Sequence, residues 1–205
     1  MSDVSGPLPV GEAIASAHTA ITRIVAVVNG GVDDDAPTPC MQWTVRDLAR
    51  HLEAISGAYV LWSSAALGGR LGDLRTGSDL AAYNDEMLQR LPDHGTSRHV
   101  TTFSQLASDH LRIVEAFPDS PMLRVPSTGV VWTVGDHAGV AALEWHLHAW
   151  DLSRAAGTVH VPDATPLAMA WSATIGPAVD APLDARGTSN GATWDAVLRA
   201  SGRSP

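Results

Sequence analysis

Three side chains have the types and the spacing to bind a divalent metal ion. Glu144 and His148 are four residues apart, so on a helix they project from one face, one turn apart. His51 comes three residues after Leu48 and four before Ile55, at the edge of an apolar stripe. Two imidazoles and one carboxylate from two facing helices make a ligand set for zinc or a similar ion, with coordination positions left open for catalysis.

Simpler interpretations of these residues stay open. A buried histidine is often only a hydrogen-bonded core residue, and an arginine near Glu144 would make this carboxylate one half of an ion pair. His110 lies on an apolar face and is either a fourth ligand or a packed core histidine. His146 projects roughly opposite Glu144 and is expected at the helix surface or at a neighbouring contact. The other histidines have no comparable setting: His18, His94, His99, His137 and His160.

Composition and motifs exclude several other functions. All 13 basic residues are arginine, and without lysine the protein cannot use Schiff-base chemistry or a lysine-bearing phosphate loop. The sequence has no G-x-S-x-G elbow, no H-E-x-x-H and no G-x-G-x-x-G after a strand pattern. The formal net charge is -9 and the arginines are scattered, so we expect no nucleic-acid partner.

The single cysteine and the apolar pattern predict the cellular setting. Cys40 excludes an internal disulfide and a multi-cysteine metal site, and we assign it a small turn or packing role. The first nine residues lack a basic run before an apolar stretch, so they do not form a signal peptide. No apolar run reaches the ~20 residues of a membrane span. We therefore expect a cytoplasmic protein with no membrane partner.

Four long amphipathic helices must position these residues. Apolar spacing and stop signals predict them over residues 10–28, 44–68, 103–117 and 133–157. The second and fourth share the opening motif W-T-V-x-D, at Trp43 and Trp132, which indicates the same capping box used twice. Shorter elements are expected as a connecting helix at 80–91, a loop or extended piece at 126–131, and helical segments at 165–179 and 194–201.

These elements predict an all-α protein, an up-down-up-down four-helix bundle over residues 1–157. Residues 158–205 are too few for their own core, so they should form a short helical appendage packed on the bundle. In this order the second and fourth helices run parallel. Counted from the two threonine caps, His51 and the pair Glu144 and His148 then differ in height by ~6 to 12 Å, which demands a stagger between the helices.

Several motifs together resemble a known family. Their order along the chain resembles the mycothiol-dependent maleylpyruvate isomerase family of the DinB-like superfamily of metal-binding four-helix bundles. The resemblance covers most of residues 37–157 and implies a divalent metal, usually zinc, with nickel, manganese or iron as alternatives. It places the metal on His51, Glu144 and His148. The matching residues are Pro37 to Cys40, Trp43 to Leu48, His51, Glu144, His148 to Leu152, and Arg154 to Gly157.

The resemblance also implies a chemistry. The metal would bind the sulfur of mycothiol or another small-molecule thiol, lower its pKa and present a thiolate to an electrophilic substrate. Addition followed by elimination would give an isomerase, and release of the conjugate would give an S-transferase. Asp151 and Arg154 match the family at the helix end, Asp151 as a partner that orients a ligand and Arg154 as an anion contact, each with a plain salt bridge as its alternative.

The C-terminal region departs from the family. The isomerase that this chain resembles carries an α/β domain with a substrate-binding arginine, whereas this chain has a short tail with Arg186, Arg199 and Arg203. A shorter tail favours an S-transferase over a true isomerase. A metal-dependent hydrolase that uses a coordinated water, and a non-catalytic metal-binding bundle, remain alternatives. The tryptophan content leaves room for a homodimer interface.

Overall fold

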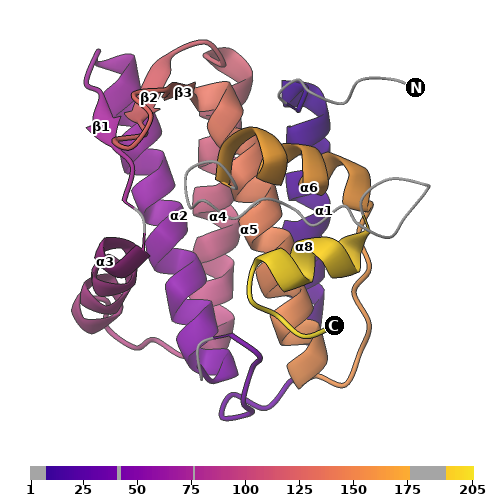
Figure 1. Ribbon diagram of the computed structural model, residues 1–205. Helices are drawn as coiled ribbons and strands as arrows, with labels where there is room; N and C mark the ends of the chain where they lie inside the picture. The colour runs from indigo at the N-terminus through magenta and orange to yellow at the C-terminus, as the bar shows by residue number, and fades with distance from the viewer. Residues whose placement is uncertain (1–7, 41–42, 76, 176–192) are drawn as a thin grey trace.

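Four long helices lie side by side in the structure, a computed structural model that describes residues 8–40, 43–75, 77–175 and 193–205 (Figure 1). The predicted all-α bundle is therefore confirmed. Its helices are α1 (Val10–Asn29), α2 (Val45–Leu67), α4 (Thr96–Ala116) and α5 (Val134–Ala155). No helix of the described ranges is both long and apolar enough to cross a membrane.

The repeated W-T-V-x-D motif begins two of the bundle helices. Thr44 at the start of α2 and Thr133 at the start of α5 each accept a hydrogen bond from the backbone of the aspartate three residues on. The carboxylates of Asp47 and Asp136 bond back to the capping backbone, so both predicted capping boxes are complete. Each carboxylate also lies at the positive end of its helix dipole.

The predicted up-down-up-down order is wrong, because α2 and α4 run parallel. Glu53 meets His99 near the beginning of the two helices, and Ser63 meets His110 further along both. The physical reason is α3 (Gly77–Arg90), which lies outside the bundle beside α2 and takes the chain back towards the end at which α2 began (Figure 1). A connection that crosses the length of the bundle leaves the next helix pointing the same way.

As a result α2 and α5 are antiparallel, not parallel as predicted. His51 faces His148 near the beginning of α2, whereas Trp62, further along α2, faces His137 near the beginning of α5. His51 comes seven residues after the cap of α2, and His148 comes seven residues before the last residue of α5. The two histidines therefore reach the same height without the predicted stagger.

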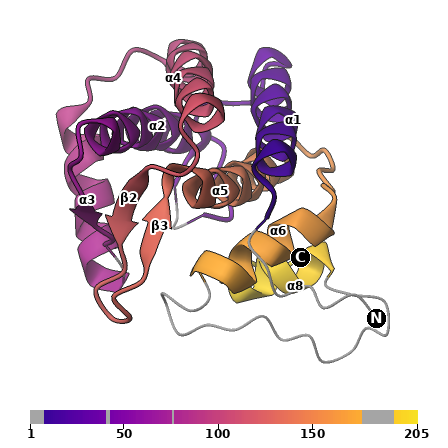
Figure 2. The same ribbon diagram turned by 90° about the horizontal axis from the view of Figure 1, so that it is seen from above.

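A small sheet covers one end of the bundle. It contains β1 (Gly72–Asp73), β2 (Pro121–Arg124) and β3 (Val131–Thr133) in the order β1-β2-β3, with β1 parallel and β3 antiparallel to β2. The residues predicted as a loop or extended piece at 126–131 make the turn between β2 and β3 and enter β3. Seen from above, β3 lies beside α5, and β2 contacts α2 (Figure 2).

The C-terminal region packs on the bundle as a helical appendage, as predicted. It contains α6 (Ala164–Ala170), the π-helical turn η1 (Trp171–Ile175) and α8 (Trp194–Ala200). Its apolar residues share one core with the bundle, so the division of the chain after residue 157 stays a prediction. The last part of the run predicted at 165–179 and Arg186 lie outside the described residues. The shared core residues are Leu167, Ala168, Trp171, Trp194, Val197 and Leu198.

Candidate metal centre

The structure brings the three predicted ligands together. Nε2 of His51 lies 3.3 Å from Oε1 of Glu144, and Nε2 of His148 lies 3.8 Å from the same oxygen. One ligand atom from each residue lies within 4.8 Å of the others. Because metal–ligand bonds are about 2.0–2.2 Å long, ligands of one tetrahedral ion stand about 3–4 Å apart. The distances from Glu144 to the two histidines fall in this range, and the ligand atoms of the two histidines lie within 4.8 Å of each other, so the three groups can face one divalent ion.

The buried stripe of α2 turns His51 inward. Leu48 and Leu52 are fully buried, and His51 between them is only 3% exposed. The indole of Trp43, just before the cap of α2, lies 4.7 Å from the imidazole of His51, measured between ring centroids. Nδ1 of His51 is buried and has no hydrogen-bond partner among the described residues. Nε2, on the other side of the ring, faces Glu144, so this is the nitrogen that His51 presents to a candidate ion.

Burial and mutual contact set the charges of the three side chains. Burial lowers the pKa of His51, and the contact with Glu144 offsets this only in part. Burial alone would raise the pKa of Glu144, but hydrogen bonds to His148 and His51 outweigh it and hold that pKa far below its usual range. For His148 the penalty of burial is outweighed by Asp151, Cys40 and Glu144, which raise the pKa well above its usual value. Without an ion, protonated His148 thus balances the Glu144 carboxylate, a balance that a divalent cation would supply instead.

Asp151 lies where a residue that orients His148 must lie. Nδ1 of His148 donates to Oδ2 of Asp151 over 3.1 Å, which leaves Nε2 facing Glu144. Carboxylate partners of this kind fix the tautomer and ring orientation of metal-binding histidines. Asp151 is fully buried and also accepts two hydrogen bonds from Arg203, 3.0 Å from Nε to Oδ1 and 2.7 Å from Nη2 to Oδ2.

Arg203 occupies the place near the site that the sequence analysis gave to Arg154. Arg154 is exposed, with its guanidinium 5.6 Å from the ring centroid of Trp150, and the structure does not bring it to the three ligands. Gly202 has a φ of 81° just after α8, and the backbone N–H of Arg203 bonds to the carbonyl of Leu198. This helix-ending turn is readable from the sequence, but the packing that points Arg203 at Asp151 is not.

Tyr59 is a second residue that the sequence analysis missed. It lies two helical turns after His51 on the same face of α2, and its hydroxyl donates to Oε2 of Glu144. Tyr59 is 2% exposed, and burial, with the charge of Glu144, raises its pKa well above the ordinary value. The hydroxyl therefore stays protonated and remains a donor that holds one oxygen of Glu144 while the other faces the histidines.

His110 is a packed core histidine and not a neighbour of the three ligands. Its Nδ1 lies 3.3 Å from Oγ of Ser63, and its Nε2 lies 3.4 Å from Nδ1 of His137. Both rings lie beside the ring of Tyr59, at centroid distances of 5.6 and 4.4 Å. Burial lowers the pKa of His137 to about 4 and that of His110 well below its usual value, so both are neutral at pH 7.

Two other single residues lie in buried polar contacts. His146, predicted at the helix surface or at a neighbouring contact, makes such a contact and is 1% exposed, because α1 and the chain after α5 cover its face of the helix. Its Nε2 donates to the carbonyl of Ser16 over 3.0 Å, and its Nδ1 lies 2.9 Å from Nε2 of His160. Cys40, given only a turn or packing role, is buried with its sulfur within 4.8 Å of ligand atoms of His148 and Asp151.

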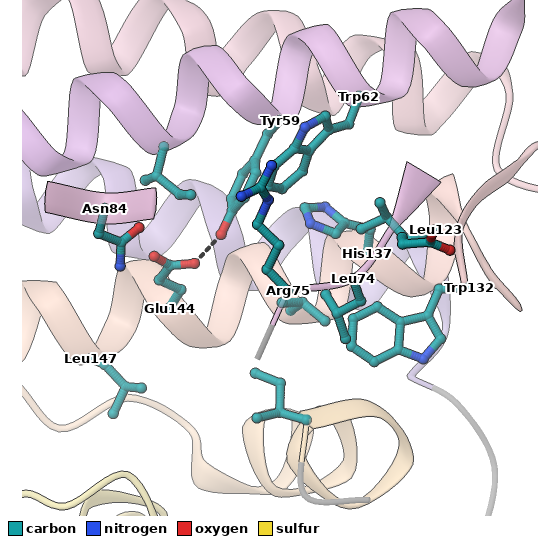
Figure 3. Close-up of a pocket in the computed structure, with 14 residues that line it drawn as sticks. Tyr59, Trp62, Leu74, Arg75, Asn84, Leu123, Trp132, His137, Glu144 and Leu147 are labelled. Carbon is teal, nitrogen blue, oxygen red and sulfur yellow. Dashed lines mark hydrogen bonds between the residues drawn. The ribbon is translucent and has the colours of Figure 1, made fainter. Parts of the chain in front are cut away.

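Two cavities meet at Glu144. The first has a volume of about 310 Å³ and is lined by the three ligands together with Cys40, Trp43 and Arg203. The second, of about 230 Å³, lies further along α2 and closer to the beginning of α5, towards Trp62 and Trp132 (Figure 3). Three residues line both cavities: Asn84, Glu144 and Leu147.

One comparison with known proteins finds a matching family. Residues 14–153 match the model of the family described as the mycothiol maleylpyruvate isomerase N-terminal domain. The match extends from α1 almost to the end of α5 and includes the three candidate ligands and Asp151. No curated protein and no solved structure matches the chain.

Proposed function

The chain belongs to the family of the mycothiol maleylpyruvate isomerase N-terminal domain, and on this premise we propose that it is a metal-dependent enzyme that joins the sulfur of mycothiol to a small electrophile. One observation carries the proposal. Two imidazoles and one carboxylate meet at the wall of a cavity of about 310 Å³ that has room for a small molecule.

The ligand set decides which cofactor fits. His51, Glu144 and His148 would hold the ion, and nitrogen and oxygen donors of this kind suit zinc first and nickel, manganese or iron as alternatives. When bound, the ion supplies Lewis-acid chemistry that lowers the pKa of a thiol and so favours the nucleophilic thiolate. The nucleophile then comes from the small-molecule thiol and not from the protein.

The chain's own residues prepare the site for this chemistry. Asp151 keeps the proton of His148 on Nδ1, and Arg203 compensates the charge of Asp151 in the protein interior. Tyr59 holds Oε2 of Glu144 and so limits rotation of the carboxylate. The indole of Trp43 lies against His51 and screens one side of the ligands from water.

Metal content and thiol transfer test the proposal together. The protein should contain about one ion per chain, measured by plasma mass spectrometry after reconstitution with zinc. His51→Ala and Glu144→Ala should lose that ion, whereas His18→Ala, a change at an exposed histidine of α1, should retain it. The zinc-loaded protein should convert mycothiol and an epoxide, either glycidol or styrene oxide, to the thioether at a rate that both site variants lose.

Other outcomes would overturn the proposal. Absence of metal after reconstitution, or metal that both site variants retain, would contradict the proposed metal centre. Metal at the site with hydrolysis of esters or amides in the absence of thiol would identify a hydrolase. Metal without turnover in either assay would identify a non-catalytic binding protein.

A further inference from the structure

The second cavity has mostly apolar walls. It lies between α2, the small sheet, α5 and η1, and the side chains in Figure 3 converge on it from these elements. Trp132 and Val140 are buried, whereas Leu74 and Trp62 are partly exposed at its rim. The apolar residues that line it are Ile55, Trp62, Leu74, Leu123, Trp132, Val140, Leu147 and Ile175.

Most polar groups on this wall already have partners. The hydroxyl of Tyr59 bonds to Glu144, and Nδ1 of His137 contacts His110. Asp73 pairs with a neighbouring arginine, and the guanidinium of Arg75 lies 4.5 Å from the ring centroid of Tyr83. These groups therefore offer little to a strongly polar ligand.

The charges of the lining do not suit an anion. Among the residues that line this cavity, the carboxylates of Asp73 and Glu144 face the single cation Arg75. His137 is neutral at pH 7 and adds no positive charge. A dicarboxylate would give up its hydration without meeting a lining of excess positive charge. An uncharged apolar molecule has no charged groups to desolvate and so enters without this cost.

The volume sets the size of the occupant. An enclosed apolar cavity of about 150 Å³ already binds benzene. A cavity of about 230 Å³ therefore accommodates one substituted aromatic ring or a short alkyl chain, but not a fused polycyclic molecule.

The shared wall sets the orientation of the occupant. Glu144, Asn84 and Leu147 separate this cavity from the one that contains the candidate metal ligands. Oδ1 of Asn84 is buried and has no hydrogen-bond partner among the described residues. An amide at this position can bond to a polar group at the reactive end of a ligand whose apolar body lies against Trp62 and Trp132.

We propose that this apolar cavity binds the uncharged apolar body of the electrophile, one aromatic ring or a short alkyl chain, while the thiol occupies the polar cavity beside the metal ligands. This inference rests on the proposed function. With an epoxide, the thiolate sulfur attacks a ring carbon near Glu144, the C–S bond forms, the C–O bond breaks, and the resulting alkoxide takes a proton from water. The preferred substrate is then an apolar electrophile and not a dicarboxylate.

Paired epoxides and paired variants test the inference. With zinc and mycothiol, the wild type should show a kcat/KM at least tenfold higher for styrene oxide than for glycidol. Leu74→Trp, which fills the cavity, should lower kcat/KM for styrene oxide at least tenfold and change that for glycidol less than twofold. Leu71→Trp introduces the same indole at an exposed position on the other side of β1 and should change neither value.

A second variant and a binding measurement extend the test, and the binding measurement does not depend on turnover. Leu74→Ala enlarges the cavity and should raise kcat/KM for 2-naphthyloxirane relative to kcat/KM for styrene oxide. The unreactive probe 1-phenylethanol should bind to the wild type and to Leu71→Trp, but at least tenfold more weakly to Leu74→Trp, measured by calorimetry with metal content as the control for folding.

The outcomes separate the two proposals. Equal use of the two epoxides, or a preference that Leu74→Trp leaves unchanged, would overturn the assignment of this cavity while thiol transfer stands. The zinc-loaded wild type could turn over neither epoxide and still bind 1-phenylethanol in a way that Leu74→Trp abolishes. This result would overturn the proposed function and retain the apolar site. Failure of 1-phenylethanol to bind to the wild type would overturn the inference directly.

Discussion

The imidazoles of His51 and His148 lie edge to face with their ring centroids 5.1 Å apart, although 97 positions separate them in the sequence. They meet because α2 and α5 run in opposite directions. The beginning of α2 then lies beside the end of α5, and the carboxylate of Glu144, one turn before His148, completes the group. The direction of two helices therefore determines whether these residues can form a metal centre.

Asp151→Asn should weaken zinc binding by about 10- to 100-fold, the usual effect of losing a partner that orients a ligand. The carboxylate of Asp151 accepts the Nδ1 proton of His148, whereas an amide also presents a donor and no longer fixes that tautomer. Competition with a chromophoric chelator measures the affinity. Asp195→Asn, at an exposed position of α8, is the matched control, and an unchanged affinity in Asp151→Asn would contradict the orienting role.

Local spacing made the inward positions of the three candidate ligands predictable. Glu144 and His148 belong to one helix, so their common face follows from the helical repeat alone, and the stripe of α2 places His51 inward. The four-helix bundle and both capping boxes follow from equally local patterns, whereas the DinB-like superfamily follows from a resemblance of motifs.

Long-range packing accounts for what the sequence did not reveal. The direction of α4 depends on the path of α3, and the spacing of apolar residues along the sequence does not predict that path. Arg203 reaches Asp151 only because α8 packs on the bundle, and 52 positions separate the two residues. Tyr59 lies on the apolar face of α2, where a hydrophobic role was sufficient to explain it.

Arg203→Gln should lower the free energy of unfolding by roughly 3 kcal/mol, because it leaves the buried carboxylate of Asp151 without its charged partner. The double variant Asp151→Asn with Arg203→Gln should recover part of this loss, since no unpaired charge remains. Urea unfolding of both single variants and the double variant measures the coupling. Arg199→Gln, on the exposed side of α8, should have little effect, and additive losses in the double variant would show that the pair is not coupled.

Tyr59→Phe should reduce zinc affinity and lower the free energy of unfolding by about 2 kcal/mol, the typical contribution of a hydrogen bond to a charged group. The substitution keeps the ring that packs against His137 and removes only the hydroxyl that holds Oε2 of Glu144. Chelator competition and urea unfolding give the two values. Tyr83→Phe, at a partly exposed ring, should leave both nearly unchanged; equal effects of the two substitutions would argue against a specific role of the Tyr59 hydroxyl.

The His146 and His160 pair should make the protein less stable as the pH falls from about 6.5 to 4. Burial lowers the pKa of both histidines to about 4; repulsion between the two rings adds to the effect at His146, and the charge of Arg23 adds to it at His160. In the unfolded chain a histidine has a pKa of about 6.5, so between these values the unfolded state binds protons that the folded state does not. The stability that the pair contributes is therefore complete above the pKa in the unfolded chain, about 6.5, and is lost as the pH falls towards the pKa in the folded protein, about 4.

His160→Gln isolates the contribution of this pair. An amide N–H can still donate to Nδ1 of His146 but does not titrate, so the variant should lose stability less steeply between pH 7 and pH 5, by at most about 1.4 kcal/mol per pH unit. Some dependence should remain, because burial also lowers the pKa values of His137 and His110. Urea unfolding at pH 7, 6 and 5 measures the slope. His18→Gln, at an exposed histidine, should retain the wild-type slope, and a wild-type slope in His160→Gln would mean that the pair does not link acid to unfolding.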